Sequence, residues 1–245
     1  MKKLLLASLA LAAVCSAQSA LAADMPVKAR PLPPAVILFS WTGFYVGGQV
    51  GWAQATDDAS IENPGIPFPP PIFIPFQVEM EGIIGGGHVG FLWQYNNIVL
   101  GVEGSFDVSD LDKAFVVGVC PLFCGNATTS IDHQASFRGI LGWAIDRFLI
   151  YATGGVAFAD ITNTYDTTAF GGGFASIGDW RTGWTIGGGL KYAFTNNWSI
   201  RGEYRFSDFG DFIDKSNVAF FPATNLNRHV EQHQAQLGVS YRFGP

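Results

Sequence analysis

Apolar and polar residues alternate strictly along the last stretch of the chain, residues 235–243. Every second residue from Ala235 to Phe243 is apolar or aromatic, and those between are polar or glycine. Because successive side chains of a strand point to opposite faces, this pattern predicts a strand with one apolar and one polar face. The pattern recurs, and we expect eight strands, near residues 41–55, 82–95, 98–110, 132–145, 148–160, 179–194, 198–209 and 228–243.

The gaps between these strands are alternately short and long. Short turns are expected at Asn96-Asn97, around Asp146-Arg147 and at 195–197, where Asn and Asp suit tight hairpins. Long loops are expected at 56–81, 111–131, 161–178 and 210–227. Short turns at one end and long loops at the other are typical of outer-membrane barrels, whose short turns face the periplasm.

The start of the chain indicates export. Lys2 and Lys3 precede a short apolar run, and Ala20 and Ala22 stand where a signal peptidase reads small residues. We therefore expect a signal peptide at 1–22, a proline-rich periplasmic lead at 23–40 and a barrel domain at 41–245. The apolar run is too short for a membrane-spanning helix, which needs about 20 residues.

The apolar face of the predicted strands is crowded with aromatic residues at the short-turn ends. They are Trp93, Trp143, Phe194, Trp198, Tyr241 and Phe243. Such a ring is typical of the girdle that a membrane barrel places at the lipid interface. A soluble barrel with an apolar interior is the alternative, and the many charges at the opposite positions argue against it. The sequence thus predicts an all-β, eight-stranded antiparallel up-and-down transmembrane β-barrel with short periplasmic turns and long extracellular loops.

The polar face of the strands is expected to line the barrel interior. Its charged residues form a predicted lumen network of Glu103, Arg138, Lys191, Arg201, Glu203, Arg205 and Arg242. Eight strands leave an interior just wide enough to be filled by side chains. We therefore favour a plug of paired charges over a narrow, anion-leaning pore.

Two short motifs carry candidate chemistry. His229, Glu231 and His233 share the outward face of the last strand, and two imidazoles with a carboxylate suit a transition metal. No fourth ligand is evident, so a polar collar that touches lipopolysaccharide is the favoured interpretation. Cys120 and Cys124 lie in a long loop of an exported chain, where a disulfide is expected.

The balance of charge bears on the partners. The chain carries 20 acidic and 14 basic side chains, and loss of the signal peptide removes two lysines and no acid. Without a basic patch to neutralise phosphates, nucleic acid is not an expected partner. We expect a monomer in the outer membrane of a Gram-negative cell, in contact with lipid and lipopolysaccharide, without a cofactor.

Three segments resemble a known family. Residues 39–48, 151–158 and 198–206 are similar to strands of the small alphaproteobacterial outer-membrane immunogenic proteins, which are OmpA-like transmembrane barrels. The resemblance implies a surface antigen inserted by the barrel-assembly machinery, which reads a terminal aromatic residue. Here Gly244 and Pro245 follow Phe243, so the chain departs from the family at that point.

No catalytic constellation stands out along the chain. The sequence therefore predicts a structural barrel that supports envelope integrity and displays loops at the cell surface. The alternatives are a small porin-like diffusion pore, a barrel enzyme that modifies lipopolysaccharide, and an adhesin that works through the long loops. The enzyme would need an outward nucleophile beside a base, and no outward serine accompanies His229 or His233.

Overall fold

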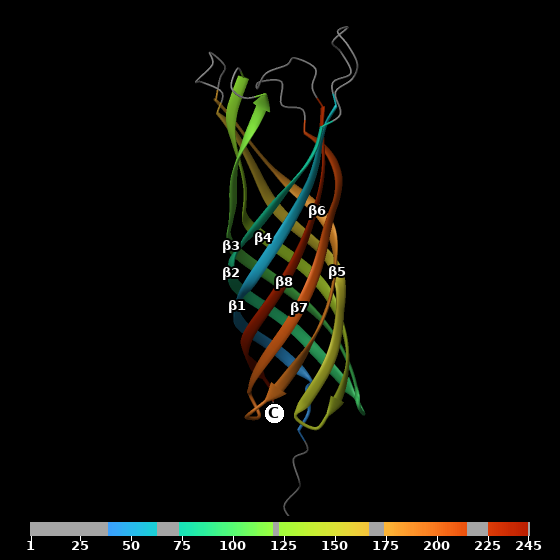
Figure 1. The fold of residues 1–245 in the computed structure, drawn as a ribbon. Coiled ribbons are helices and arrows are strands. Elements are labelled where there is room, and N and C mark those ends of the chain that lie inside the picture. Colours follow the sequence, from blue (N-terminus) through green and yellow to red (C-terminus); the bar gives the residue numbers. More distant parts are fainter. Residues whose placement is uncertain (1–38, 63–73, 120–122, 167–173, 215–224, 245) are drawn as a thin grey trace, which may run out of the picture. The chain divides into compact units, whose positions relative to one another are not determined.

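Eight long strands make up the described part of the chain, and Figure 1 shows how they are arranged. The computed structural model describes residues 39–62, 74–119, 123–166, 174–214 and 225–244. The strands are β1 Gly43–Glu62, β2 Ile74–Tyr95, β3 Ile98–Val119, β4 Phe123–Ile145, β5 Phe148–Asp166, β6 Phe174–Ala193, β7 Trp198–Asp214 and β8 Asn225–Phe243. Within the residues described, no helix is long and apolar enough to span a membrane.

The strands form one closed up-and-down barrel. Each pairs antiparallel with its neighbours in the sequence, and β8 pairs with β1 from Phe44↔Phe243 to Glu62↔Asn225. Closure leaves no free sheet edge near the short turns. Toward the long loops, the β2–β3 and β6–β7 ladders end at Ile84↔Ser109 and Trp184↔Asp208. The predicted strand number and up-and-down topology are confirmed.

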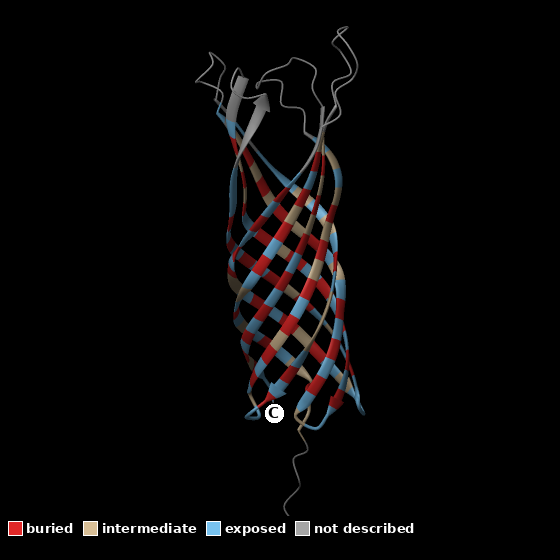
Figure 2. Ribbon diagram, in the orientation of Figure 1, coloured by how far each residue is buried: buried red, intermediate tan, exposed pale blue. Residues whose placement is uncertain are grey.

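Burial alternates along every strand near the short turns (Figure 2). On β8, Gln236 and Arg242 are buried inside, whereas Leu237 and Phe243 are exposed on the outer wall. Leu237 is 70% exposed, more than any other large apolar side chain among the described residues. The outer wall of this part of the barrel is therefore apolar, as contact with lipid requires, whereas Gln236 and Arg242 on the inner face of β8 are polar.

The strands run further toward the long-loop end than the alternation predicted. Much of the expected loops 56–81, 111–131, 161–178 and 210–227 is strand, and β3 and β4 form a hairpin that continues to Val119↔Phe123. The physical reason is an inversion of the pattern. On β2, Val78 and Met80 are buried inside while Glu79 and Glu81 face outward. Beyond the apolar band the outer wall meets water, so the barrel there is patterned like a soluble one.

Two tight turns each place an Asn or Asp residue in the left-handed region of backbone conformation. Asn96 has a φ of 55° and Asp146 a φ of 52°. Asn and Asp tolerate this conformation better than other residues with a Cβ atom. The predicted turns at Asn96-Asn97 and Asp146-Arg147 are thus present, and each joins two strands in register.

Asn96 offers a test of this turn. Replacing it by valine should lower the free energy of unfolding by about 1–2 kcal/mol, because the β-branched valine, unlike asparagine, is strained in left-handed backbone. Asn96→Gly should leave it nearly unchanged, since glycine adopts positive φ freely. Urea unfolding of the refolded barrel, followed by tryptophan fluorescence, measures both. Equal losses in the two variants would contradict a conformational role for this position.

Candidate functional site

Two glutamates bridged by one arginine occupy the middle of the lumen. Nη2 of Arg138 on β4 donates to Oε1 of Glu103 at 2.5 Å, and Nη1 donates to Oε1 of Glu203. Arg138 is the register partner of Glu103, while Glu203 is contributed by β7. All three side chains are at most 1% exposed. Since buried charges persist only when they are paired and hydrogen-bonded, this bridge ties three strands together.

Further cations surround the same carboxylates. Nη1 of Arg201 donates to both oxygens of Glu103, at 2.8 and 2.7 Å, and Nζ of Lys191 lies 3.7 Å from Glu103 Oε2. Arg205 instead donates to Oε1 of Gln236 at 2.9 Å and lies 3.5 Å from Oδ2 of Asp107. The structure thus brings three of the predicted cations, Arg138, Lys191 and Arg201, around the two predicted glutamates, with Arg205 beside Asp107.

Two tyrosines complete the network, and the sequence reasoning missed them. The hydroxyl of Tyr45 donates to Glu103 at 2.6 Å, and that of Tyr151 donates to Glu203 at 2.8 Å. The ammonium of Lys191 lies 4.4 Å and 5.1 Å from the centres of the two rings. Both tyrosines occupy inward positions of their strands, so the parity that identified the charged residues also pointed to them.

The register places this network in two matching rows across the barrel wall. One row is Tyr45, Gly90 and Glu103 on β1–β3, and the other is Tyr151, Gly189 and Glu203 on β5–β7. A Cβ atom at Gly90 would lie 2.5 Å from Oη of Tyr45, so the glycine makes room for the ring. The next strand contributes Arg138 in the first row and Gln236 in the second. Arg138 thus donates to the glutamates of both rows, and Arg201 lies within ion-pair distance of both.

Apolar layers enclose the network on both sides. Toward the short turns the layer contains Trp41, Leu92, Val99, Ile140, Ala144, Leu149 and Ala193. Toward the long loops it contains Ala53, Ala55, Val78, Met80, Ile84, Leu111, Ile131, Ala157, Ala159, Ile161, Phe209 and Val230. The indole of Trp41 donates to the carbonyl of Asp146 at 3.3 Å, which fixes the first layer across the mouth. Side chains thus fill the described lumen at these three levels, and the buried ion pair of Arg228 with Asp57 lies beyond the second apolar layer.

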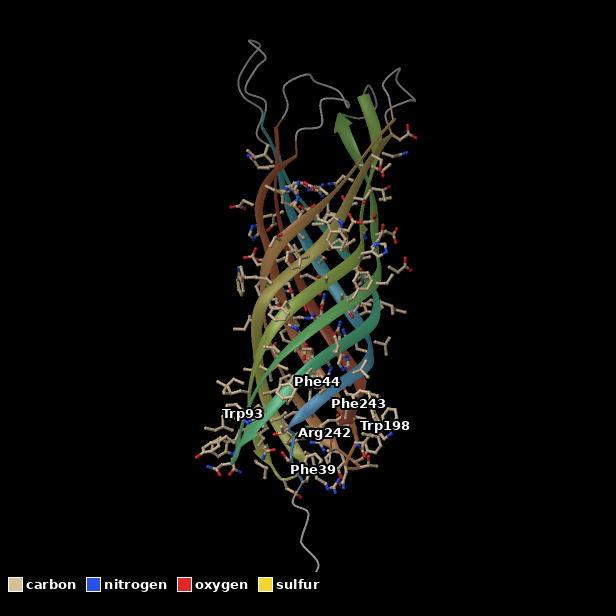
Figure 3. The ribbon with its side chains drawn as sticks, turned by 180° about the vertical axis from the view of Figure 1, so that it is seen from behind. Phe39, Phe44, Trp93, Trp198, Arg242 and Phe243 are labelled. Atoms are coloured by element: carbon tan, nitrogen blue, oxygen red, sulfur yellow. The ribbon has the colours of Figure 1, made fainter. Side chains whose placement is uncertain are left out.

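Arg242 does not join the network, contrary to the prediction. Its guanidinium lies 4.7 Å from the ring centre of Phe39, and Nη2 donates to the carbonyl of Asn196. Figure 3 shows Phe39 and Arg242 together at the short-turn end. Arg242 is the last inward residue of β8, so the apolar layer around Trp41 separates it from Glu103.

The six residues of the predicted aromatic girdle lie on the outer wall at the short-turn end. Figure 3 labels Trp93, Trp198 and Phe243 there, together with Phe44. A second group of outward aromatic residues lies nearer the long loops and was not anticipated; its members are Trp52, Trp180, Trp184 and Tyr204. The wall between the two groups is the apolar band that fits a bilayer core.

The predicted histidine cluster is divided between two sites on the outer wall. Nε2 of His229 lies 3.3 Å from Glu231 Oε1, and Nδ1 lies 2.9 Å from Asp211 Oδ1 on β7. His233 is separate, because its Nδ1 bonds to the hydroxyl of Tyr204 at 2.7 Å. Partial burial lowers the pKa of His229, but the bonds to Glu231 and Asp211 outweigh it and raise the pKa above its ordinary value.

The predicted disulfide lies partly beyond what the structure describes. Cys120 is outside the described residues, and so is Pro245. The Cys120–Cys124 bridge therefore stays a prediction. Gly244 takes a φ of 147° directly after Phe243, so the chain leaves the strand at that point.

Comparisons with known proteins agree with this architecture. Residues 7–243 match the model of the outer membrane protein beta-barrel domain. The chain is 31% identical to the 31 kDa outer-membrane immunogenic protein of Brucella melitensis biotype 1, over 99% of this chain and 100% of that protein. It is 27% identical to the 22 kDa outer membrane protein of Rhizobium leguminosarum bv. viciae, over 83% and 79%. The crystal structure of OprG from Pseudomonas aeruginosa has the same fold, with a TM-score of 0.50 and 14% identity, over 83% of this chain and 97% of that one.

Proposed function

The chain belongs to the outer membrane protein β-barrel family, and from that membership we propose that it is a structural, non-catalytic barrel that supports envelope integrity. Its location is the outer membrane. We infer further that it displays its long loops at the cell surface. Strands that run past the apolar band support this display, and so does the name of the Brucella relative, which is called immunogenic.

The filled lumen is the observation that carries this proposal. The bridge of Arg138 to Glu103 and Glu203 crosses the interior between two apolar layers. An ion that entered would have to displace Trp41 at one end and the layer around Met80 at the other, and then break buried ion pairs. These costs favour a plug over the porin-like alternative.

The enzyme alternative needs an outward nucleophile beside a base, and neither outward histidine of β8 has one among the described residues. The hydrogen-bond partners of His229 are carboxylates, and the partner of His233 is the phenol of Tyr204. Neither pair places a serine or cysteine beside a base. We propose accordingly that membrane lipid and lipopolysaccharide are contacts of the wall rather than substrates. The closed barrel supports a monomer, and insertion is assigned to the barrel-assembly machinery.

Planar-bilayer recording tests the plug. Purified barrel is expected to show no steady conductance, because side chains occupy the lumen at every described level. A known porin, inserted in the same way, serves as the positive control for insertion. Steady openings of one size, from protein with the heat-modifiable gel migration of a folded barrel, would overturn the plug and favour the pore.

Envelope support is tested in cells. Deletion of the gene should raise sensitivity to bile salts and detergents, and the wild-type protein should restore resistance. A catalytic role predicts altered acyl chains in lipid A after deletion, so mass spectra of lipid A separate the two. Normal detergent resistance in the deletion strain would contradict the structural role.

A further inference from the structure

A cluster of metal-binding side chains lies on the outer wall of β7 and β8, where Asp208 is the register partner of Trp184 in the second aromatic group. Asp208, His229 and Glu231 each offer one ligand atom, and these atoms lie within 4.8 Å of one another. Nε2 of His229 is 3.8 Å from Oδ1 of Asp208 and 3.3 Å from Oε1 of Glu231. All three side chains are partly exposed, so an ion reaches them from the aqueous side.

A β-bulge builds this cluster. The register between β7 and β8 shifts between Asp208↔Glu231 and Asp211↔His229. Gly210 allows the shift with a φ of 68°, and its amide donates to Oδ1 of Asp208 at 2.7 Å. Bulges re-aim side chains, and this one directs two carboxylates of β7 toward one imidazole of β8.

Asp211 prepares the imidazole for metal binding. Its Oδ1 lies 2.9 Å from Nδ1 of His229. When Nδ1–H donates to that carboxylate, the lone pair of the neutral ring is on Nε2, which faces Asp208 and Glu231. A carboxylate behind the distal nitrogen is the usual support of a metal-ligating histidine.

We propose that Asp208, His229 and Glu231 bind one divalent transition-metal ion of the Zn²⁺ type at the outer rim of the barrel. One imidazole nitrogen and two carboxylate oxygens are ligands that Zn²⁺ accepts, with water in the remaining position. Asp58 on β1, the register partner of His229, adds negative charge on the same face. The ion joins β7 to β8 at the bulge, where the ladder of backbone hydrogen bonds is interrupted.

Zinc titration of the full chain tests the proposal. The cysteines are alkylated in the unfolded state, so that thiols do not compete, and the chain is refolded in detergent micelles. Calorimetry should find one Zn²⁺ per barrel at pH 7.5. His229→Ala and Asp208→Asn should each weaken binding at least about tenfold, and Asp211→Asn should weaken it about tenfold through the ring orientation.

His233→Ala is the matched control, because His233 is also outward on β8 but bonds to Tyr204. This variant should bind Zn²⁺ within about twofold of wild type, since the supporting shell is intact. Zinc should also raise the unfolding midpoint of wild type and His233→Ala, but not that of His229→Ala. Heat-modifiable gel migration confirms that each variant is folded.

Three results would overturn the site. One is the absence of saturable Zn²⁺ binding by the folded wild type, which would leave His229 as a protonated clamp between carboxylates. Another is unchanged Zn²⁺ affinity in His229→Ala, which would assign the ion to the surrounding carboxylates alone. The third is an equal loss in His233→Ala, which would indicate loose binding to any exposed imidazole.

Discussion

Arg138→Met is expected to lower the free energy of unfolding of the barrel by about 3–5 kcal/mol, the range seen when one partner of a buried ion pair is removed. The arginine contacts both Glu103 and Glu203, and each is almost fully buried. Arg201 and Lys191 still neutralise Glu103 in the variant, but Glu203 keeps the hydroxyl of Tyr151 and guanidinium groups that lie farther away. The loss therefore falls mainly on Glu203.

Equilibrium unfolding in urea, from refolded barrel in lipid vesicles, measures this loss. Arg181→Met is the control, because Arg181 is only partly buried, pairs with the exposed Asp179 and lies over the ring of Phe212, so its loss should cost at most about 1 kcal/mol. Adding Glu203→Gln to Arg138→Met should recover part of the loss, since it removes the unpaired charge. Equal losses in Arg138→Met and Arg181→Met would show that the bridge does not hold the lumen together.

The part of the fold that lipid contacts could be predicted from the sequence. A bilayer demands an apolar outer face along every strand, so the alternation is regular and its parity is unambiguous. The strand number, the closing pair of β1 and β8 and the inward position of Glu103 or Arg138 all follow from that parity. All of these features can be read from which face of its strand each side chain occupies.

The extended ends of the strands were missed because the pattern there reverses phase. Val78 and Met80 point inward while Glu79 and Glu81 point outward, so a search for one continuous apolar face stops near residue 82. The reversal is itself readable in the sequence once both phases are considered. It marks the level at which the outer wall passes from lipid to water.

Side-chain partners were predicted less well, because parity gives the face of a residue but not its level along the barrel. Level depends on strand tilt and stagger, which are set jointly by all eight strands. Arg242 was grouped with Glu103 on parity alone, although it lies beyond an apolar layer. Asp208 and Asp211 were missed as partners of His229 because a bulge shifts their register.

Leu237→Arg should also have a large effect, lowering the free energy of unfolding by about 2–4 kcal/mol in a bilayer. Leu237 projects from the outer wall of β8 between the two aromatic groups, opposite Val50 of β1 and Gly202 of β7. A guanidinium at that level meets hydrocarbon and has no polar partner on either neighbouring strand. The loss should be much smaller in detergent micelles, where the charged end reaches water more easily.

Gln77→Arg separates lipid exposure from the general cost of a new charge. Gln77 is also outward and exposed, but it lies past the phase reversal on β2, opposite Asp58 of β1. An arginine there should cost at most about 1 kcal/mol in the same vesicles, because the wall at that level faces water. Equal losses in the two variants would place both positions in one environment and would contradict the proposed boundary of the apolar band. A loss confined to Leu237→Arg, and reduced in micelles, would locate the bilayer between the two aromatic groups, with the phase reversal above it.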